Sequence, residues 1–274
     1  MAILSVLLFA GVAIGAPTLV DRSTTVSIMS AGVISTYAPY ASLASAAYCS
    51  TANTWTCAQC KNLPGFVPYA TGGDGDSVPK WYVGWWPAQS TVVVGHQGTN
   101  PAQLSGQPFF IFVPRRVEFS QGMRSIIWRV VFYNHAVQVH DGFMKAQAAT
   151  ATTILAGVKS LLSAHSATKV LAIGHSLGGA IATLDALYFR INLPPTVSIK
   201  AVTFGLPRVG NQAFADLIDS QITDFSYVTN EKDLVPILPG EISTGRLHGM
   251  TPNSPGPPFQ AVSSDMFTQA ARNI

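Results

Sequence analysis

The apolar positions of this 274-residue chain recur with two different spacings. Segments in which they recur every three to four residues indicate helices, and short β-branched or aliphatic runs bounded by glycine or polar residues indicate strands. The predicted helices are 23–48, 145–165, 177–191 and 212–221. The predicted strands are 90–95, 169–174, 199–205 and 224–230.

From residue 145 onward, helical and strand patterns alternate. Strands separated by helices of ten to fifteen residues form parallel β-α-β units, so we expect an α/β fold whose central, mostly parallel sheet is covered by helices on both faces. Residues 50–80 look like loop, because Gly, Asp and Pro punctuate them. Two segments do not fit the alternation of strands and helices. They are residues 106–135, with four arginines among dense apolar residues, and the Ser-, Pro- and Gly-rich residues 241–274.

Composition narrows the classes of function. Hydrophobic residues make up 48% of the chain, enough for a sizeable core, which argues against a disordered protein. Charged residues make up only 11%, and the formal net charge is +3. No basic run or aromatic-and-basic signature is present, so nucleic acid is excluded as the main partner.

Residues 1–16 are almost wholly apolar and end in small residues before Pro17, which predicts a signal peptide and a secreted protein. A membrane anchor is the alternative, but the apolar stretch is shorter than the roughly 20 residues that a span needs. Cys57 and Cys60 form a C-x-x-C, for which we expect a local disulfide, leaving Cys49 as the odd cysteine. The sequence has no second C-x-x-C and no pair of histidines near these cysteines, so it does not indicate a metal site.

The most informative motif runs from Gly174 to Gly178, a G-x-S-x-G between a predicted strand and a predicted helix. A serine on such a sharp turn projects its hydroxyl outward, so Ser176 is a candidate nucleophile. The backbone N–H of Leu177 would face an oxyanion at the start of the helix. The alternative is a structural turn whose serine caps the helix.

A serine nucleophile needs a base and an acid that orients it, and in this topology the order is Ser, Asp or Glu, then His. Three of the following acids, Asp185, Asp216 and Asp219, lie in predicted helices, where a solvated face explains them. Asp233, just past a predicted strand, is favoured over Glu231 as the acid.

The only histidine after Asp233 is His248, which makes it the candidate base. A surface histidine in an irregular tail is the alternative explanation for it.

Four motifs, VVVGHQGTN, KVLAIGHSLGGAIATLDAL, VTFGLPRVGNQAF and NEKDLVPILPG, resemble in order and spacing the fungal class 3 lipases, a family of secreted α/β-hydrolases. The resemblance covers about residues 30–100 and 139–240. It implies that Ser176 is the nucleophile, Asp233 the acid and Thr99, with Leu177, part of the oxyanion hole. It also implies cleavage of carboxylic esters through an acyl-enzyme, without metal or cofactor, on a lipid or ester substrate.

The departures from the family pattern lie in the two atypical segments. Residues 106–135 occupy the place of the family's lid, and are either an unusual lid or foreign sequence. The family's C-terminal segment, with its catalytic histidine and a cysteine that pairs with the N-terminal one, is not found after Gly240, where only Leu247-His248-Gly249 offers a histidine. We therefore expect one domain over residues 17–274. For its function we expect a triacylglycerol lipase or esterase. The alternative is a catalytically impaired lipase-like chain, or a misassembled reading frame.

Overall fold

The computed structural model describes residues 27–28, 30–99, 137–230, 233, 235–237, 242–243, 246–247 and 260–261. The predicted signal peptide, segment 106–135 and most of residues 241–274 lie outside this range. The strands are β1 Ser27–Ile28, β2 Val67–Gly72, β3 Trp81–Trp86, β4 Thr91–His96, β5 Lys169–His175, β6 Ser198–Phe204, β7 Asp224–Thr229, β8 Ile242–Ser243, β9 Arg246–Leu247 and β10 Gln260–Ala261. The helices are α1 Ala31–Ala46, α3 Asp141–Ala148, α4 Ala151–Ala164, α5 Leu177–Asn192 and α6 Gln212–Gln221, with short 3-10 turns η1 Gln59–Asn62, η2 Pro87–Gln89 and η4 Val235–Ile237.

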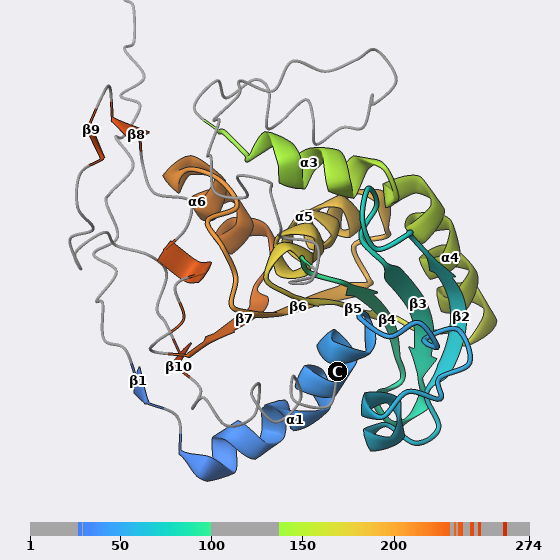
Figure 1. Cartoon of the computed structure of the whole chain (residues 1–274). Helices are drawn as coiled ribbons and strands as arrows, with labels where there is room; N and C mark the ends of the chain where they lie inside the picture. The colour runs from blue at the N-terminus through green and yellow to red at the C-terminus, as the bar shows by residue number, and fades with distance from the viewer. Residues whose placement is uncertain are drawn as a thin grey trace, which may run out of the picture.

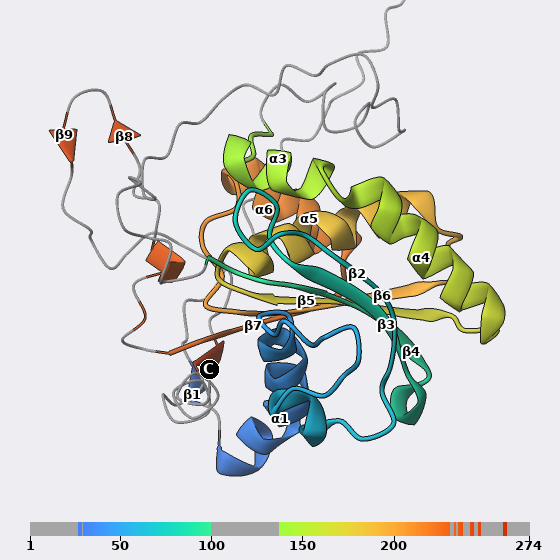
Figure 2. The same ribbon diagram turned by 45° about the vertical axis from the view of Figure 1, so that its right-hand side comes forward.

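The larger of two sheets in the described part of the chain is mixed, with strand order β1-β10-β7-β6-β5-β4-β3-β2, and β8 and β9 form a separate antiparallel pair. Strands β4 to β7 pair in parallel, whereas β3 and β2 extend the sheet in antiparallel fashion. Helix α1 covers one face, and α3, α4, α5 and α6 cover the other (Figures 1 and 2). The predicted α/β fold with a mostly parallel sheet is confirmed.

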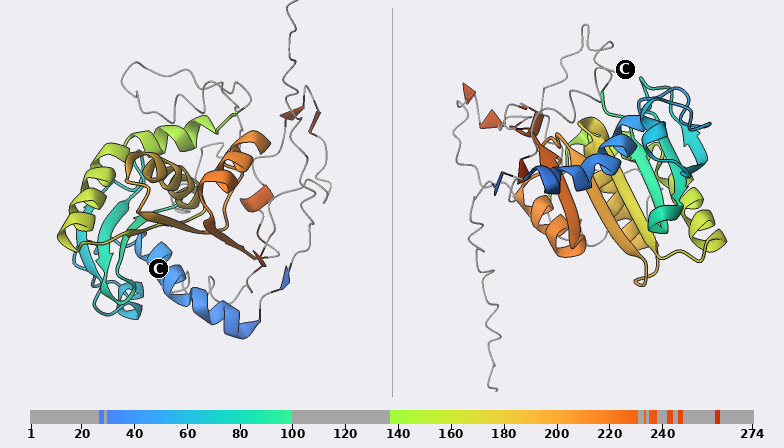
Figure 3. Two further views of the ribbon diagram at one scale, coloured as in Figure 1. Left: turned by 180° about the vertical axis from the view of Figure 1, so that it is seen from behind. Right: turned by 90° about the horizontal axis from the view of Figure 1, so that it is seen from below.

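The central strands are apolar throughout because both of their faces are buried. In β5, Leu171 and Ile173 join the core beneath α1, while Val170 and Ala172 join the core beneath α4 and α5. The view from below in the right panel of Figure 3 shows α1 lying across one face of the sheet. This double burial explains why the strand patterns were continuous apolar runs rather than alternating ones.

Two helix predictions were wrong in extent. The helix predicted over 23–48 does not include residues 27 and 28, which form β1, because Ser30 is extended and its hydroxyl caps the new helix by accepting from the Val33 N–H. The helix predicted over 145–165 is divided into α3 and α4. The division falls at Thr150, which is not helical and whose N–H and hydroxyl both bond back to the Gln147 carbonyl.

The loop predicted over 50–80 was also wrong in part, because it contains η1 and the edge strand β2. The sequence analysis did not identify β3 either. Along β2 the side chains alternate between exposed and half-buried, so its pattern carries little apolar signal.

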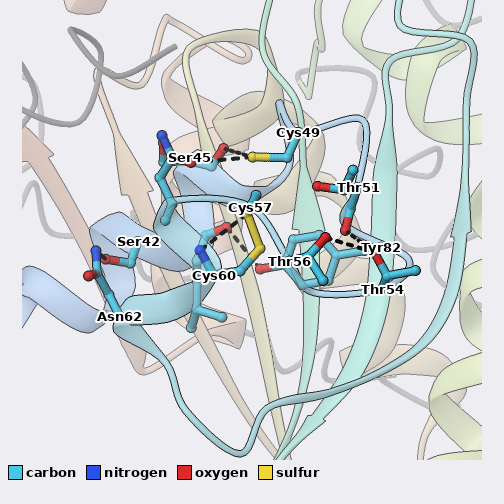
Figure 4. The surroundings of a disulfide bond; sticks show 12 residues. Ser42, Ser45, Cys49, Thr51, Thr54, Thr56, Cys57, Cys60, Asn62 and Tyr82 are labelled. Carbon is cyan, nitrogen blue, oxygen red and sulfur yellow. Dashed lines mark hydrogen bonds between the residues drawn. A yellow bond between two sulfur atoms is a disulfide. The ribbon is translucent and has the colours of Figure 1, made fainter.

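A disulfide joins Cys57 to Cys60 beside the C-terminal end of α1 (Figure 4). Cys49 keeps a free thiol, half-buried, that lies 3.4 Å from Oε1 of Gln59 and 4.0 Å from the carbonyl oxygen of Ser45. Burial raises the pKa of this thiol. The thiol is therefore held mainly in its neutral, less reactive form.

Candidate active site

Ser176 occupies a sharp turn between β5 and α5. Its backbone has φ 54° and ψ −126°, a conformation that residues other than glycine rarely adopt. The backbone N–H of Ser176 donates to the carbonyl of Phe204 at the end of β6, which fixes the turn to the neighbouring strand. The serine side chain makes no capping bond to α5. A strained turn that leaves the hydroxyl out of local bonding suits a nucleophile.

The turn after β4 lies directly against this elbow. A Cβ atom built on Gly178 would lie 2.2 Å from the carbonyl oxygen of His96, so only glycine allows α5 to begin so close to β4. On the other side of the contact, a Cβ on Gly98 would lie 3.2 Å from Cβ of Ser176. Residues that are some 80 positions apart in the sequence are thereby brought together at one edge of the sheet.

Two groups at this junction can donate hydrogen bonds to a negatively charged oxygen. The Thr99 hydroxyl is buried and has no partner among the residues that the structure describes, which is an unfavourable state for a polar atom unless a ligand satisfies it. Leu177 is the first residue of α5, so its N–H has no acceptor within the helix, and the helix dipole there favours negative charge. The position of both groups suits an oxyanion hole.

Asp233 reaches the same edge of the sheet from the loop that follows β7. Its Oδ2 lies 2.7 Å from where a Cβ of Gly205 would be, and Nε2 of His175 lies 3.4 Å from the same point. Its Oδ1 accepts the N–H of Val235, which holds the carboxylate in place. Since the backbone N–H of Ser176 bonds to Phe204 and the Asp233 carboxylate adjoins Gly205, both residues lie at the C-terminal end of β6. Glu231 and His248 lie outside the described residues.

His175 and Tyr48 form a polar pair beneath the elbow. The Tyr48 hydroxyl lies 2.8 Å from Nδ1 of His175, and the backbone of Gly98 makes a hydrogen bond with the same hydroxyl. Burial raises the pKa of Tyr48 well above its usual value, and desolvation lowers the pKa of His175 to about 4. Both side chains are therefore neutral around pH 7.

A second polar group is buried within the helical layer. His96 Nε2 lies 2.8 Å from Oδ2 of Asp185, and the Gln147 side-chain amide donates to Oδ1 of Asp185, also at 2.8 Å. His96 and Asp185 are 1% and 0% exposed. The expectation that Asp185 lies on a solvated helix face was therefore wrong, because a carboxylate with two side-chain partners can be buried. Asp216 and Asp219 are exposed, as expected.

Sequence reasoning missed Tyr48 and the His96–Asp185–Gln147 group. For Tyr48 the sequence offered no signal, since a tyrosine at the end of an apolar helix is ordinarily core. Asp185 did carry one: its helix is buried nearly all round, from Gly178 to Leu187. An acid inside a helix without a polar face must find buried partners.

Neither a metal centre nor a membrane span is found in the part of the chain that the structure covers. Within it, no three His, Cys, Asp or Glu side chains gather closely enough to bind a metal ion. The described helices also lack the length and apolar character that crossing a membrane requires.

Known proteins share this sequence pattern and this fold. The family model described as Lipase (class 3) matches residues 112–243. A lipase of Rhizopus niveus is 30% identical over 223 residues, which cover 78% of this chain and 52% of that protein. Secreted mono- and diacylglycerol lipase 1 of Fusarium solani is 41% identical over 101 residues, 37% of this chain and 29% of that protein. The chain thus spans about half the length, or less, of these curated relatives.

Solved structures agree. Lipase II from Rhizopus niveus has a TM-score of 0.65 and 28% identity, with 77% of each chain covered. The lipase from Rhizopus microsporus var. chinensis has a TM-score of 0.63 and 26% identity, covering 85% of this chain and 79% of that one. Together with the nucleophile elbow and the mixed sheet, these matches make the chain similar to the class 3 lipases and show that it has an α/β-hydrolase-like fold.

Proposed function

We propose that this protein is a secreted serine hydrolase that cleaves the carboxylic esters of acylglycerols. The observation that carries the proposal is the strained Ser176 turn packed against the Gly98–Thr99 turn, whose Thr99 hydroxyl has no hydrogen-bond partner among the described residues. A nucleophile at a helix start with preorganised donors at its side is the arrangement that acyl transfer needs.

In the proposed reaction, Oγ of Ser176 attacks the ester carbonyl carbon. The carbonyl oxygen becomes negatively charged and accepts hydrogen bonds from Thr99 and from the Leu177 N–H. The C–O bond then breaks, the alcohol leaves with the proton taken from Ser176, and the acyl group stays on the serine. Water attacks the acyl-enzyme in a second, equivalent cycle and releases the fatty acid.

We assign the role of base to His248 and that of orienting acid to Asp233. Asp233 is supported by its fixed carboxylate beside Gly205, at the sheet edge that also carries Ser176. His248 is supported by chain order, because it is the sole histidine after Asp233. The base takes the serine proton during attack and returns it to the leaving alcohol.

The substrate class and the location are proposed from the names of the relatives. The Fusarium solani protein is named a secreted mono- and diacylglycerol lipase, and we extend its substrate class and its secretion to this chain. Residues 1–16 would direct secretion. The family match runs through residues 112–135, which supports assigning segment 106–135 to the same domain over residues 17–274.

The test is hydrolysis of p-nitrophenyl butyrate and of emulsified dioleoylglycerol by the purified secreted protein, beside Ser176→Ala, Asp233→Asn and His248→Ala. We expect the serine variant to lose nearly all activity, and the other two to lose on the order of 10³-fold or more in kcat. Loss in the serine variant alone would refute the assignment of His248. A folded wild-type protein without activity would favour the catalytically impaired alternative.

A further inference from the structure

A single hydroxyl group connects three segments that build the active site. Tyr48 follows α1, Gly98 follows β4, and His175 ends β5. The Tyr48 hydroxyl bonds to Nδ1 of His175 at 2.8 Å and to the backbone of Gly98. The segment before the nucleophile and the turn before Thr99 are therefore linked through one partly buried side chain.

The Tyr48 hydroxyl can accept one hydrogen bond and donate another at the same time. The bond from Gly98 acts to lower the pKa of the phenol, so it is donated by the Gly98 N–H to the phenol oxygen. The phenol keeps its proton, and we assign that proton to the bond with Nδ1 of the neutral His175. His175 then carries its own proton on Nε2, on the side of Gly205 where Asp233 lies.

The link acts at the place where the proposed oxyanion hole is assembled. Gly98 is in such close contact with the elbow that a Cβ on it would lie 2.4 Å from the His175 carbonyl oxygen. Thr99 is the next residue in the chain, so its position depends on that of Gly98. Donors of an oxyanion hole must be held to within about 0.5 Å to be effective, so whatever fixes Gly98 also fixes Thr99.

We propose that Tyr48 and His175 are positioning residues that hold the Gly98–Thr99 turn against the Ser176 elbow. This inference rests on the proposed function, since the turn matters for catalysis only if Thr99 stabilises an oxyanion. Neither side chain takes part in the chemical step itself.

Tyr82 supplies a matched control. Its ring is fully buried, and its hydroxyl donates to the Leu43 carbonyl at 2.9 Å, so Tyr82→Phe likewise deletes a tyrosine hydrogen bond, here a fully buried one. That bond ties β3 to α1 and does not involve the Gly98 turn. A general loss of stability would affect both phenylalanine variants, whereas a loss of positioning would affect Tyr48→Phe alone.

The experiment compares wild type, Tyr48→Phe and Tyr82→Phe in two assays. In ester hydrolysis we expect Tyr48→Phe to lower kcat by about 10- to 100-fold with KM within about twofold, and Tyr82→Phe to keep the wild-type kcat. In amide hydrogen exchange of glycine-labelled protein, we expect the Gly98 N–H to exchange at least about tenfold faster in Tyr48→Phe and unchanged in Tyr82→Phe.

Two histidine variants refine the test. Asn at position 175 places an amide oxygen where Nδ1 was, so His175→Asn should recover much of the kcat that His175→Leu loses. Combining Tyr48→Phe with Thr99→Ala should cost less than the product of the two single effects, because both act through the same oxyanion contact.

Each outcome is decisive. An active wild type whose Tyr48→Phe variant keeps its kcat overturns the positioning role, whether or not Gly98 exchange accelerates. Equal losses in the two phenylalanine variants also overturn it. A folded wild type that hydrolyses no ester refutes the proposed function, and the inference is refuted with it.

Discussion

Replacing Gly98 by alanine tests whether the contact between the two turns is as tight as the structure indicates. A Cβ at this position would lie 2.3 Å from the Tyr48 hydroxyl, 2.4 Å from the His175 carbonyl oxygen and 3.2 Å from Cβ of Ser176. Real Cβ atoms essentially never approach other atoms closer than 3.0 Å. The backbone contact alone therefore requires the turn to move by at least about 0.6 Å.

The magnitude follows from what that movement does to the proposed oxyanion hole. A displacement of about 1 Å near reacting groups costs on the order of 100-fold in rate. We expect Gly98→Ala to lower kcat/KM by about that factor, equivalent to about 2.7 kcal/mol of transition-state stabilisation. Overpacking should also lower the free energy of unfolding by ~1–3 kcal/mol.

Gly157→Ala is the matched control. Position 157 lies in α4, and the nearest atom to an added Cβ is a Tyr69 ring carbon at 3.6 Å, an ordinary contact. This variant should keep its kcat/KM within about twofold and gain up to ~1 kcal/mol of stability. Steady-state hydrolysis of p-nitrophenyl butyrate and urea unfolding give both quantities. A folded Gly98→Ala protein that retains more than a third of the wild-type kcat/KM would refute the argument.

Three further predictions concern stability. Desolvation lowers the pKa of His175 from 6.5 to about 4, so the neutral side chain contributes its full share to the free energy of unfolding above pH 6.5 and loses it as the pH falls toward 4. Urea titrations should therefore show that the wild type loses ~3 kcal/mol more stability than His175→Asn between pH 6.5 and 4. Parallel curves of the two proteins would contradict this. Asp185→Ala, which strips His96 of its partner, should cost ~3–5 kcal/mol by urea unfolding, and a cost below 1 would show that the pair is dispensable. Replacing Cys57 and Cys60 together by alanine should cost ~1–2 kcal/mol, and an unchanged urea midpoint would argue against a constraining disulfide.

The sequence predicted the elements whose signal is local. The α/β order, α6 over residues 212–221 and the β5–α5 junction around Ser176 are confirmed, because each is set by a hydrophobic period or by turn glycines within a few residues. Helix α1 was predicted too long because the apolar spacing continues before Ser30, while the cap decides where the helix begins. Strand β2 was missed because an edge strand with alternating exposure looks like loop.

The residues of the candidate site likewise divide into those with a local sequence signal and those placed by tertiary packing. The residues proposed to touch substrate, Ser176, Leu177 and Thr99, belong to short motifs, since a nucleophile turn and an oxyanion turn are each built from consecutive residues. The apolar helix around Asp185 could have indicated that this carboxylate is buried, but it could not have indicated that its partner is His96, 89 positions away. Which distant side chain satisfies a buried carboxylate is decided by tertiary packing, and a hydrophobic pattern does not carry that information.

The Tyr48–His175 hydrogen bond joins residues that are 127 positions apart in the sequence, so it too is decided by tertiary packing rather than by a local pattern. A hydroxyl nucleophile and its oxyanion donors act only when their mutual distance is fixed, yet they are carried by two turns after different strands. Main-chain pairing of β4 with β5 sets the register, with His96 opposite Gly174, but it ends before Gly98 and Ser176. Beyond the last paired residues, the distance between the turns depends on glycines that permit contact and on side chains that maintain it. Catalysis in this fold should therefore be sensitive to residues that never contact the substrate, and Tyr48 is the residue at which that sensitivity can be measured against a second hydrogen-bonded tyrosine, Tyr82.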